Sequence, residues 1–342
     1  VEGFVECLDR HNLAPGETVL WMSEACMACN ITLYPHHMKT LLNARGGGLE
    51  KAGVYVGDLF FKDISPRASF NAVFAYMFGG LLRRVACRLR PYECHAGDVD
   101  QVLEVSLEIL YEAFMGRIKK QDALAAVMER FEKIPVAKTE RPKVAIFGDL
   151  YSRDNRVMNQ DLIRFIERHG GEVVTTPYSD YARMIANPYF RKWFYERKFL
   201  TLISSKALMT TITRLERTYY RMFEPLLGEP MATFDDPPEA ILAQYGVRIE
   251  HTGESLDNLL KVHYIKKHHP DVTLFVQASP AFCCPSLVTE AMARRIEEVT
   301  GVPVVPITYD GTASPKNNSI IPYLQYPRTA KRKDRQPLDR AV

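Results

Sequence analysis

Two pairs of cysteines stand out, because their residue type and spacing can carry metal or redox chemistry. Cys26 and Cys29 form a Cys-x-x-Cys motif shortly after one apolar run, and Cys283 and Cys284 are adjacent to each other shortly after another. A segment with helical character follows each pair. Thiolates form more readily at a helix N-terminus, since the helix dipole and the free N–H groups stabilise negative charge. The two pairs are therefore candidates for zinc or iron–sulfur ligation, or for thiol redox chemistry.

The positions of the two pairs predict one shared metal site. In open α/β sheets, ligands bind beyond the carboxyl ends of the strands, and each pair follows a predicted strand. Neighbouring side chains in extended backbone point to opposite sides, so we expect one of Cys283 and Cys284 to be a ligand and the other to pack. A thioredoxin-like redox centre would use Cys26 and Cys29 and would leave the second pair without a role.

The remaining cysteines are weaker candidates. Cys94 follows the end of a predicted strand and is either a further ligand or a buried free cysteine. Cys7 lies in a predicted helix and Cys87 in a predicted strand. Free cysteines behave as small apolar side chains, so we expect both to be core residues.

Histidines leave zinc as the alternative metal. His36 and His37 follow the Cys-x-x-Cys motif, and His95 adjoins Cys94, which would allow a mixed Cys/His site. These histidines lack the compact two-plus-two spacing of a zinc finger, and neighbours on a helix point in different directions. Both features disfavour zinc relative to an iron–sulfur cluster.

Other enzyme classes lack their motifs in this sequence. It contains no Gly-x-Ser-x-Gly, no Gly-x4-Gly-Lys-Ser/Thr and no Gly-x-Gly-x-x-Gly after a strand, so hydrolase and kinase functions are disfavoured. Polar residues past the end of the predicted strand 143–149 can bind a ligand or cap the next helix. They are Asp149, Arg153, Asp154 and Asn159. The segment 309–312 follows the last predicted strand and can line the same ligand site.

Length and composition indicate an ordinary globular protein of about two domains. The 342 residues are 46% hydrophobic and 25% charged, and 44 basic against 41 acidic residues give a formal charge of +3. This balance gives no reason to expect a nucleic-acid partner. The basic run 331–333 lies in a tail, 331–342, which we expect to be a solvated end.

The sequence gives no sign of a membrane or secreted protein. No stretch approaches the roughly 20 apolar residues of a membrane span, no signal peptide is visible, and the seven cysteines form no secreted-type framework. We therefore expect a cytoplasmic protein. The first residues, 1–8, already predict a helix without an initiator methionine, so we also expect the chain to be part of a longer one.

The first cysteine pair belongs to a predicted α/β lobe, residues 1–97. Strands and helices alternate there, which is typical of a parallel sheet. The expected strands are 18–22, 53–58 and 84–91, and the expected helices are 31–42 and 69–82.

A helical connection, residues 98–140, is predicted to lead to a second α/β lobe, residues 141–330. Apolar residues at helical spacing cover 98–133. Within the second lobe, the aromatic-rich segment of about 180–265 predicts a helical insertion whose aromatic side chains are mostly core. The other expected elements are strands 143–149, 172–177, 272–276 and 302–307 and helices 159–169 and 287–299.

Three segments resemble a known superfamily. They are 24–30 with 34–37, 142–151 with Asn159, and 279–285 with 309–312. Together they resemble the 2-hydroxyacyl-CoA dehydratase and benzoyl-CoA reductase superfamily. The closest match is the domain C-terminal to the ATPase modules of acyl-CoA dehydratase activase-related proteins, akin to double-cubane cluster proteins.

This resemblance implies two Rossmann-like parallel-sheet lobes that hold an iron–sulfur cluster between them, either one 4Fe–4S cluster or a double cubane. The ligands carried over are Cys26 or Cys29 and Cys283 or Cys284, with Cys94 less secure. The resemblance also implies a homodimer and a partner ATPase that injects low-potential electrons. This ATPase can be a missing part of the same chain. An acyl-CoA or another small reducible compound would be the substrate. The competing class is a structural or regulatory domain without catalytic activity, holding zinc or reactive thiols.

Overall fold

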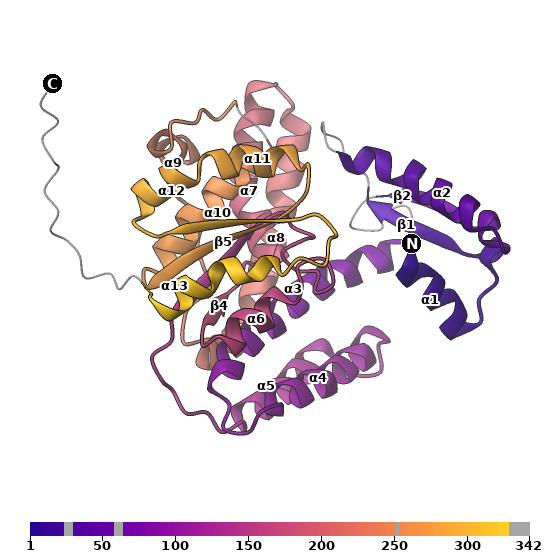
Figure 1. Cartoon of the computed structure of the whole chain (residues 1–342), viewed down its shortest axis with the longest axis horizontal. Coiled ribbons are helices and arrows are strands. Elements are labelled where there is room, and N and C mark those ends of the chain that lie inside the picture. The colour runs from indigo at the N-terminus through magenta and orange to yellow at the C-terminus, as the bar shows by residue number, and fades with distance from the viewer. Residues whose placement is uncertain (24–29, 58–63, 251–252, 328–342) are drawn as a thin grey trace, which may run out of the picture. The chain divides into compact units, whose positions relative to one another are not determined.

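The computed structural model describes residues 1–23, 30–57, 64–250 and 253–327 (Figure 1). The fold is mixed α/β, with one two-stranded and one four-stranded parallel sheet in these residues. The chain divides into two compact units, Val1–Ala75 and Tyr76–Val342. The division falls inside helix α3 (Pro66–Leu89), and each unit is described by itself.

The first unit contains a short parallel sheet. Strands β1 (Val19–Ser23) and β2 (Gly53–Gly57) pair in register from Val19 opposite Gly53 to Ser23 opposite Gly57. Helix α1 (Glu2–His11) precedes β1, and helix α2 (Tyr34–Arg45) lies between β1 and β2. The strand expected at 18–22 is confirmed, and so is the strand expected at 53–58 up to Gly57, since residue 58 lies outside the described residues. The helix expected at 31–42 is confirmed as α2, which a 3-10 turn, Asn30–Leu33, precedes.

Cys7 corrects one expectation. It lies on α1 but is exposed, and the buried residue of this helix is its neighbour Leu8. Successive residues of a helix are about 100° apart, so one core-facing position leaves the adjacent one outside. The prediction that Cys7 is a core residue is wrong.

The strand expected at 84–91 is also wrong. Helix α3 continues to Leu89, and a short 3-10 turn, Arg90–Tyr92, follows. Arg84 and Arg88 are four residues apart and share one helix face, where Arg84 pairs with Asp180 and Glu229, and Arg88 pairs with Glu172. The alternation of arginine and apolar residues resembles a strand locally. Arginine and alanine favour helix, however, and these ion pairs fix the helical face.

Cys87 lies on the same helix and is 1% exposed. Its predicted place in the core is confirmed, although the element that carries it is a helix. The helical spacing expected over 98–133 is confirmed as α4 (Asp98–Phe114) and α5 (Lys120–Glu132), which pack against each other within the second unit.

The four-stranded sheet of the second unit is entirely parallel. Its strands are β3 (Lys143–Gly148), β4 (Glu172–Val174), β5 (Val272–Pro280) and β6 (Val304–Tyr309), in the order β4-β3-β5-β6. The chain moves from β3 to β4 on one side and returns to β5 on the other side of β3. The strand order therefore reverses between β3 and β5, and in open α/β sheets ligands bind at such a reversal, beyond the carboxyl ends of the strands.

Helices cover both faces of this sheet (Figure 1). Ala145 and Phe147 of β3 pack with α10 (Glu254–His268) and α12 (Ala293–Thr300) on one face. Val144 and Ile146 pack on the other face with α6 (Leu162–Arg168) and α13 (Ile321–Gln325). Alternate residues of a strand point to opposite faces, so a continuous apolar run satisfies two covered faces.

The segment 180–265, expected to be a helical insertion, is mostly helical in its described residues and lies between β4 and β5. It comprises most of α7 (Tyr178–Tyr195), α8 (Phe199–Leu227), α9 (Pro238–Gln244) and much of α10. Only some of its aromatic side chains are in the core: Tyr220 and Phe223 are buried, whereas Phe194 and Tyr195 are exposed. The helix expected at 287–299 is two helices, α11 (Cys284–Ala291) and α12, on either side of Met292.

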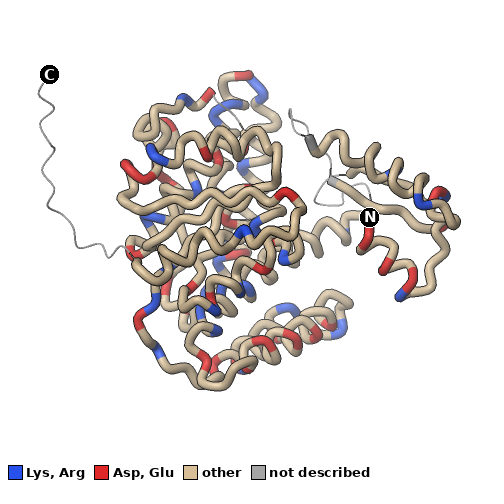
Figure 2. The backbone as a smooth tube through the Cα atoms, in the orientation of Figure 1, with Lys and Arg blue, Asp and Glu red and all other residues tan. Residues whose placement is uncertain are grey.

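Charged residues of both signs are interspersed along the helices of the second unit (Figure 2).

No helix in the described ranges combines the length and the apolar character that crossing a membrane requires.

Candidate functional site

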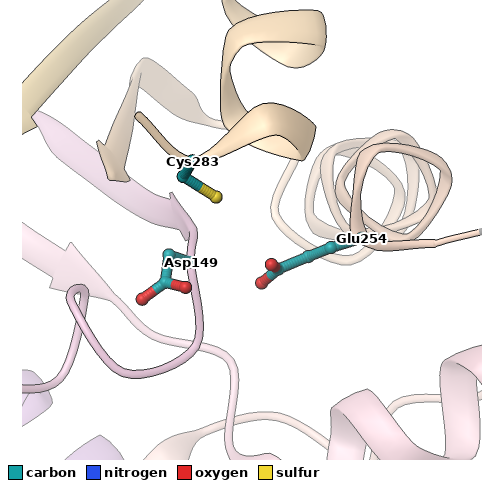
Figure 3. Close-up of side chains that lie close together, drawn as sticks. All are labelled: Asp149, Glu254 and Cys283. Atoms are coloured by element: carbon teal, nitrogen blue, oxygen red, sulfur yellow. The ribbon is translucent and has the colours of Figure 1, made fainter. Parts of the chain in front are cut away.

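Three side chains of the second unit meet where the strand order reverses. Asp149 follows β3, Cys283 follows β5, and Glu254 is the first residue of α10. One ligand-type atom from each lies within 4.8 Å of the others, and all three residues are half-buried. Figure 3 shows the thiol and the two carboxylates facing a common space. We call this group the Asp149–Glu254–Cys283 site.

The end of β3 positions Asp149. Gly148 has a φ of +109°, and a Cβ added there would lie 2.4 Å from the carbonyl oxygen of Ala278, so only glycine fits. The Asp149 amide then donates to that same oxygen at 3.0 Å. The Oδ1 of Asp149 accepts from the amides of Tyr151 at 3.1 Å and Ser152 at 2.7 Å, which fixes the orientation of its carboxylate.

Glu254 is held by the same loop. Its Oε1 accepts a hydrogen bond from the Leu150 amide at 3.2 Å. Burial raises the pKa of Glu254; the buried Lys261 opposes this shift, and the charge of Asp149 adds to it. The two carboxylates therefore repel each other in a partly desolvated place.

Cys283 is the N-cap residue of α11. Phe282, just before it, has a φ of +65°, a conformation that a residue with a bulky side chain rarely adopts and that often marks a functional turn. Burial raises the pKa of the Cys283 thiol; Ser286 opposes the shift, and Glu254 and Asp149 add to it. A cation between these groups would favour the thiolate.

Two buried cations lie behind the site. Lys261 of α10 is fully buried, and its Nζ donates to the carbonyl of Gly148 and to Oδ1 of Asn258, both at 3.1 Å. Arg153 is 2% exposed, and its Nη2 donates to the carbonyl of Thr176 at 2.7 Å. Lys261 partly balances the charge of Glu254, whereas Arg153 lies beside Asp154.

The structure separates the two adjacent cysteines. Cys283 belongs to the site, whereas Cys284 is exposed, and its Sγ lies 4.0 Å from the carbonyl of Phe282. Cys26 and Cys29 lie outside the described residues. Whether either one joins Cys283 therefore stays a prediction.

Cys94 does not join Cys283. It is exposed, and two residues before it the Tyr92 hydroxyl donates to Glu172, the first residue of β4, at 2.5 Å. Cys94 therefore lies near the amino edge of the parallel sheet, and Cys283 lies at the carboxyl edge. The six residues of β3 alone span roughly 20 Å between these edges.

Sequence reasoning identified Cys283 and Asp149 but missed Glu254 and Lys261. Glu254 starts a helix after Gly253, with Asp257 also in the first turn, and acidic residues there predict a helix start. That signal does not reveal which distant loop the helix end contacts. Lys261 stands out only as a lysine within the apolar run 259–262.

The donor set bears on the metal it can hold. A cubane iron–sulfur cluster takes thiolate ligands, and Cys283 fits one such position, but the further thiols would have to come from the pair at 26 and 29. Asp149, Glu254 and Cys283 by themselves match the thiolate and carboxylate ligands of a zinc-type ion. Among the residues that the structure describes, they are the one group of metal-type donors that meet in this way.

Comparisons with known proteins give no assignment. No protein-family model matches the chain, and neither the curated proteins nor the solved structures contain a significant match.

Proposed function

We propose that the chain is an iron–sulfur protein of ATP-driven, low-potential electron transfer. It would act as part of a reductase like the 2-hydroxyacyl-CoA dehydratases and benzoyl-CoA reductases, or of the activase of such an enzyme. One observation supports this proposal most directly. Cys283, from a segment that resembles this superfamily, lies half-buried at the strand-order reversal of a parallel sheet, where α/β proteins bind their ligands.

In this proposal, each of the two parallel sheets belongs to a Rossmann-like lobe. Cys283 supplies a thiolate from the second lobe, and Cys26 or Cys29 supplies another from the first. Cys284 is the less favoured member of its pair because its side chain is exposed. When bound, a 4Fe–4S cluster or double cubane would supply a one-electron carrier whose potential is set by its ligands, its burial and hydrogen bonds to sulfur.

The partners follow from the same resemblance. An ATP-hydrolysing activator would reduce the cluster, and the electron would pass to an acyl-CoA or another small compound that is hard to reduce. We propose a cytoplasmic homodimer for this assembly. Neither a nucleic acid nor a membrane takes part in it.

A second candidate function is a structural or regulatory domain that holds zinc or reactive thiols and has no catalytic activity. The mixed donor set of Asp149, Glu254 and Cys283 favours zinc over a cubane cluster, because carboxylates are ligands of zinc and cubane clusters take thiolates.

The test is purification without oxygen, followed by measurement of iron, acid-labile sulfide and zinc with visible and electron-paramagnetic spectra. Iron with matching sulfide is expected. Cys29→Ala and Cys283→Ala should lower both, whereas Cys87→Ala should leave both unchanged, since Cys87 is buried in α3. Zinc alone, or no metal, would instead support a structural or regulatory domain that holds zinc or reactive thiols.

A further inference from the structure

We propose that the Asp149–Glu254–Cys283 site binds a single divalent cation of the zinc or iron(II) type when the chain carries no cluster. This inference does not depend on the proposed iron–sulfur cluster, because it uses neither Cys26 nor Cys29; it uses the donor set that also favours the second candidate function. It follows from how the three side chains are held and from the charges around them.

The ligands come from three separate elements that converge on one point (Figure 3). The loop after β3 supplies a carboxylate, the start of α10 supplies another, and the residue capping α11 supplies a thiol. A metal ion needs ligand atoms held at fixed positions before it arrives, and residues on the ends of rigid strands and helices provide this.

Backbone amides orient both carboxylates in the way that outer-shell groups orient metal ligands. These hydrogen bonds engage Oδ1 of Asp149 and Oε1 of Glu254. The other oxygen of each carboxylate has no hydrogen bond within the described part of the chain. One oxygen of each group therefore remains for a cation.

The charges around the site also favour a cation. Two carboxylates and a thiolate would place three negative charges within 4.8 Å of one another. Lys261 lies close by, but its Nζ is directed to the Gly148 carbonyl and to Asn258, and no ion pair joins it to either carboxylate among the described residues. A divalent ion bound by all three groups would neutralise most of this repulsion.

The donor set selects the class of metal. A thiolate is a soft ligand that disfavours magnesium and calcium, whereas carboxylates are hard ligands, and zinc and iron(II) accept both. Three protein ligands leave a fourth tetrahedral position open, as in catalytic rather than structural zinc sites. The open position would hold water or a small ligand.

Cobalt(II) is the probe for the test, because it takes zinc-type sites and its absorption reports thiolate ligation. The Cys26→Ser/Cys29→Ser chain, freed of metal with a chelator and kept reduced without oxygen, is titrated with cobalt(II). We expect one equivalent to bind, with a thiolate-to-cobalt charge-transfer band and the strong visible bands of tetrahedral cobalt.

Variants in the same background locate the bound ion. Cys283→Ser should abolish the charge-transfer band, and Asp149→Asn and Glu254→Gln should each weaken binding at least tenfold. Cys284→Ser and Asp310→Asn are the matched controls, since they remove an exposed thiol next in the chain and an exposed carboxylate after β6. Both should bind as the parent does. Circular dichroism checks that each variant is folded.

A second measurement needs no change at the site. Stoichiometric zinc should slow alkylation of Cys283 at least tenfold in the Cys26→Ser/Cys29→Ser chain, as mapped by mass spectrometry, and should leave the rate at Cys284 unchanged. The inference is overturned if no charge-transfer band forms, if Cys283→Ser retains it, or if zinc does not protect Cys283.

The result is separable from that of the proposed function. Cobalt binding without any assembly of iron and sulfide in the unaltered chain supports the mononuclear site and rejects the cluster. A cluster in the unaltered chain, with no cobalt binding in the Cys26→Ser/Cys29→Ser chain, supports the cluster and rejects the mononuclear site.

Discussion

The buried ammonium of Lys261 donates a hydrogen bond to the carbonyl oxygen of Gly148, with 3.1 Å between the two atoms. This bond joins the middle of α10 to the last residue of β3, directly before Asp149. A charge-assisted hydrogen bond of this kind is stronger than a neutral one. It therefore helps to hold the start of α10, and with it Glu254, against the loop that carries Asp149.

The lowered pKa of Lys261 predicts that the free energy of unfolding depends on pH. Burial and the nearby Arg153 lower the pKa of Lys261 to about 8, from an ordinary value of 10.5. Between these values the unfolded chain binds a proton that the folded chain does not, so the free energy of unfolding rises with pH. The contribution is on the order of 3 kcal/mol over this window.

Urea unfolding at pH 8 and pH 10 of the parent and Lys261→Met measures this effect. The parent should gain stability relative to the variant as the pH rises, because the variant has no such group. Titration of tyrosines is shared by the two proteins and cancels in the comparison. An equal change in both proteins would contradict the prediction.

Gly148→Ala should destabilise the second unit by about 3 kcal/mol or more. The new Cβ would lie 2.4 Å from the Ala278 carbonyl oxygen, in a backbone conformation with a φ of +109°. Gly228→Ala is the control, because its φ is +71° and nothing lies within 4 Å of the added Cβ. There, only the left-handed conformation costs energy, about 1–2 kcal/mol. Equal losses in chemical denaturation would show that the contact with Ala278 is not limiting.

The sheet of the second unit was predictable from sequence because its strands are continuous apolar runs. Such runs occur where both faces are covered, and 143–149 and 272–276 both became strands. The prediction of a strand at 84–91 is wrong because the alternation of arginine and apolar residues in this segment also fits a strand. In the helix, Arg84 and Arg88 pair with Asp180, Glu229 and Glu172, which are distant in sequence, so the local pattern does not reveal these contacts.

The candidate site was predictable only where a residue lies within three positions after the end of a strand. Cys283 and Asp149 satisfy that rule, since the carboxyl ends of β5 and β3 adjoin. Glu254 begins α10, the last helix of the long insertion, and no spacing rule links it to β3. Cys94 follows a helical segment instead of the expected strand, which is why it lies at the other edge of the sheet.

Arg183→Met should cost about 3–5 kcal/mol of stability. Arg183 is buried between α7 and α8; it pairs with Asp180, and its Nε lies 3.0 Å from Oε2 of Glu216. Methionine keeps much of the volume but leaves Glu216 as a buried charge without this partner. Burial already raises the pKa of Glu216, with Arg183 opposing the shift, so the variant should drive this carboxyl further toward its neutral form.

Arg294→Met provides the comparison for Arg183→Met. Arg294 pairs with Glu298, but its side chain is 89% exposed, and exposed pairs contribute little. Its loss should change stability by no more than about 0.5 kcal/mol. Urea unfolding of both variants at pH 7 measures the contrast, and a similar small loss in each would show that the buried arginine is not required.

The cysteines of the second unit should differ sharply in reactivity, with Cys87 the least reactive. Burial raises the pKa of the Cys87 thiol to about 12, and it is 1% exposed, so at pH 8 it has almost no thiolate and no access to a reagent. Cys94 and Cys284 are exposed. Iodoacetamide should label both within the time that leaves Cys87 unmodified, in metal-free, reduced protein mapped by mass spectrometry. In urea all three should react alike, because unfolding removes the burial, and rapid labelling of Cys87 in the folded chain would show that α3 opens at its buried face.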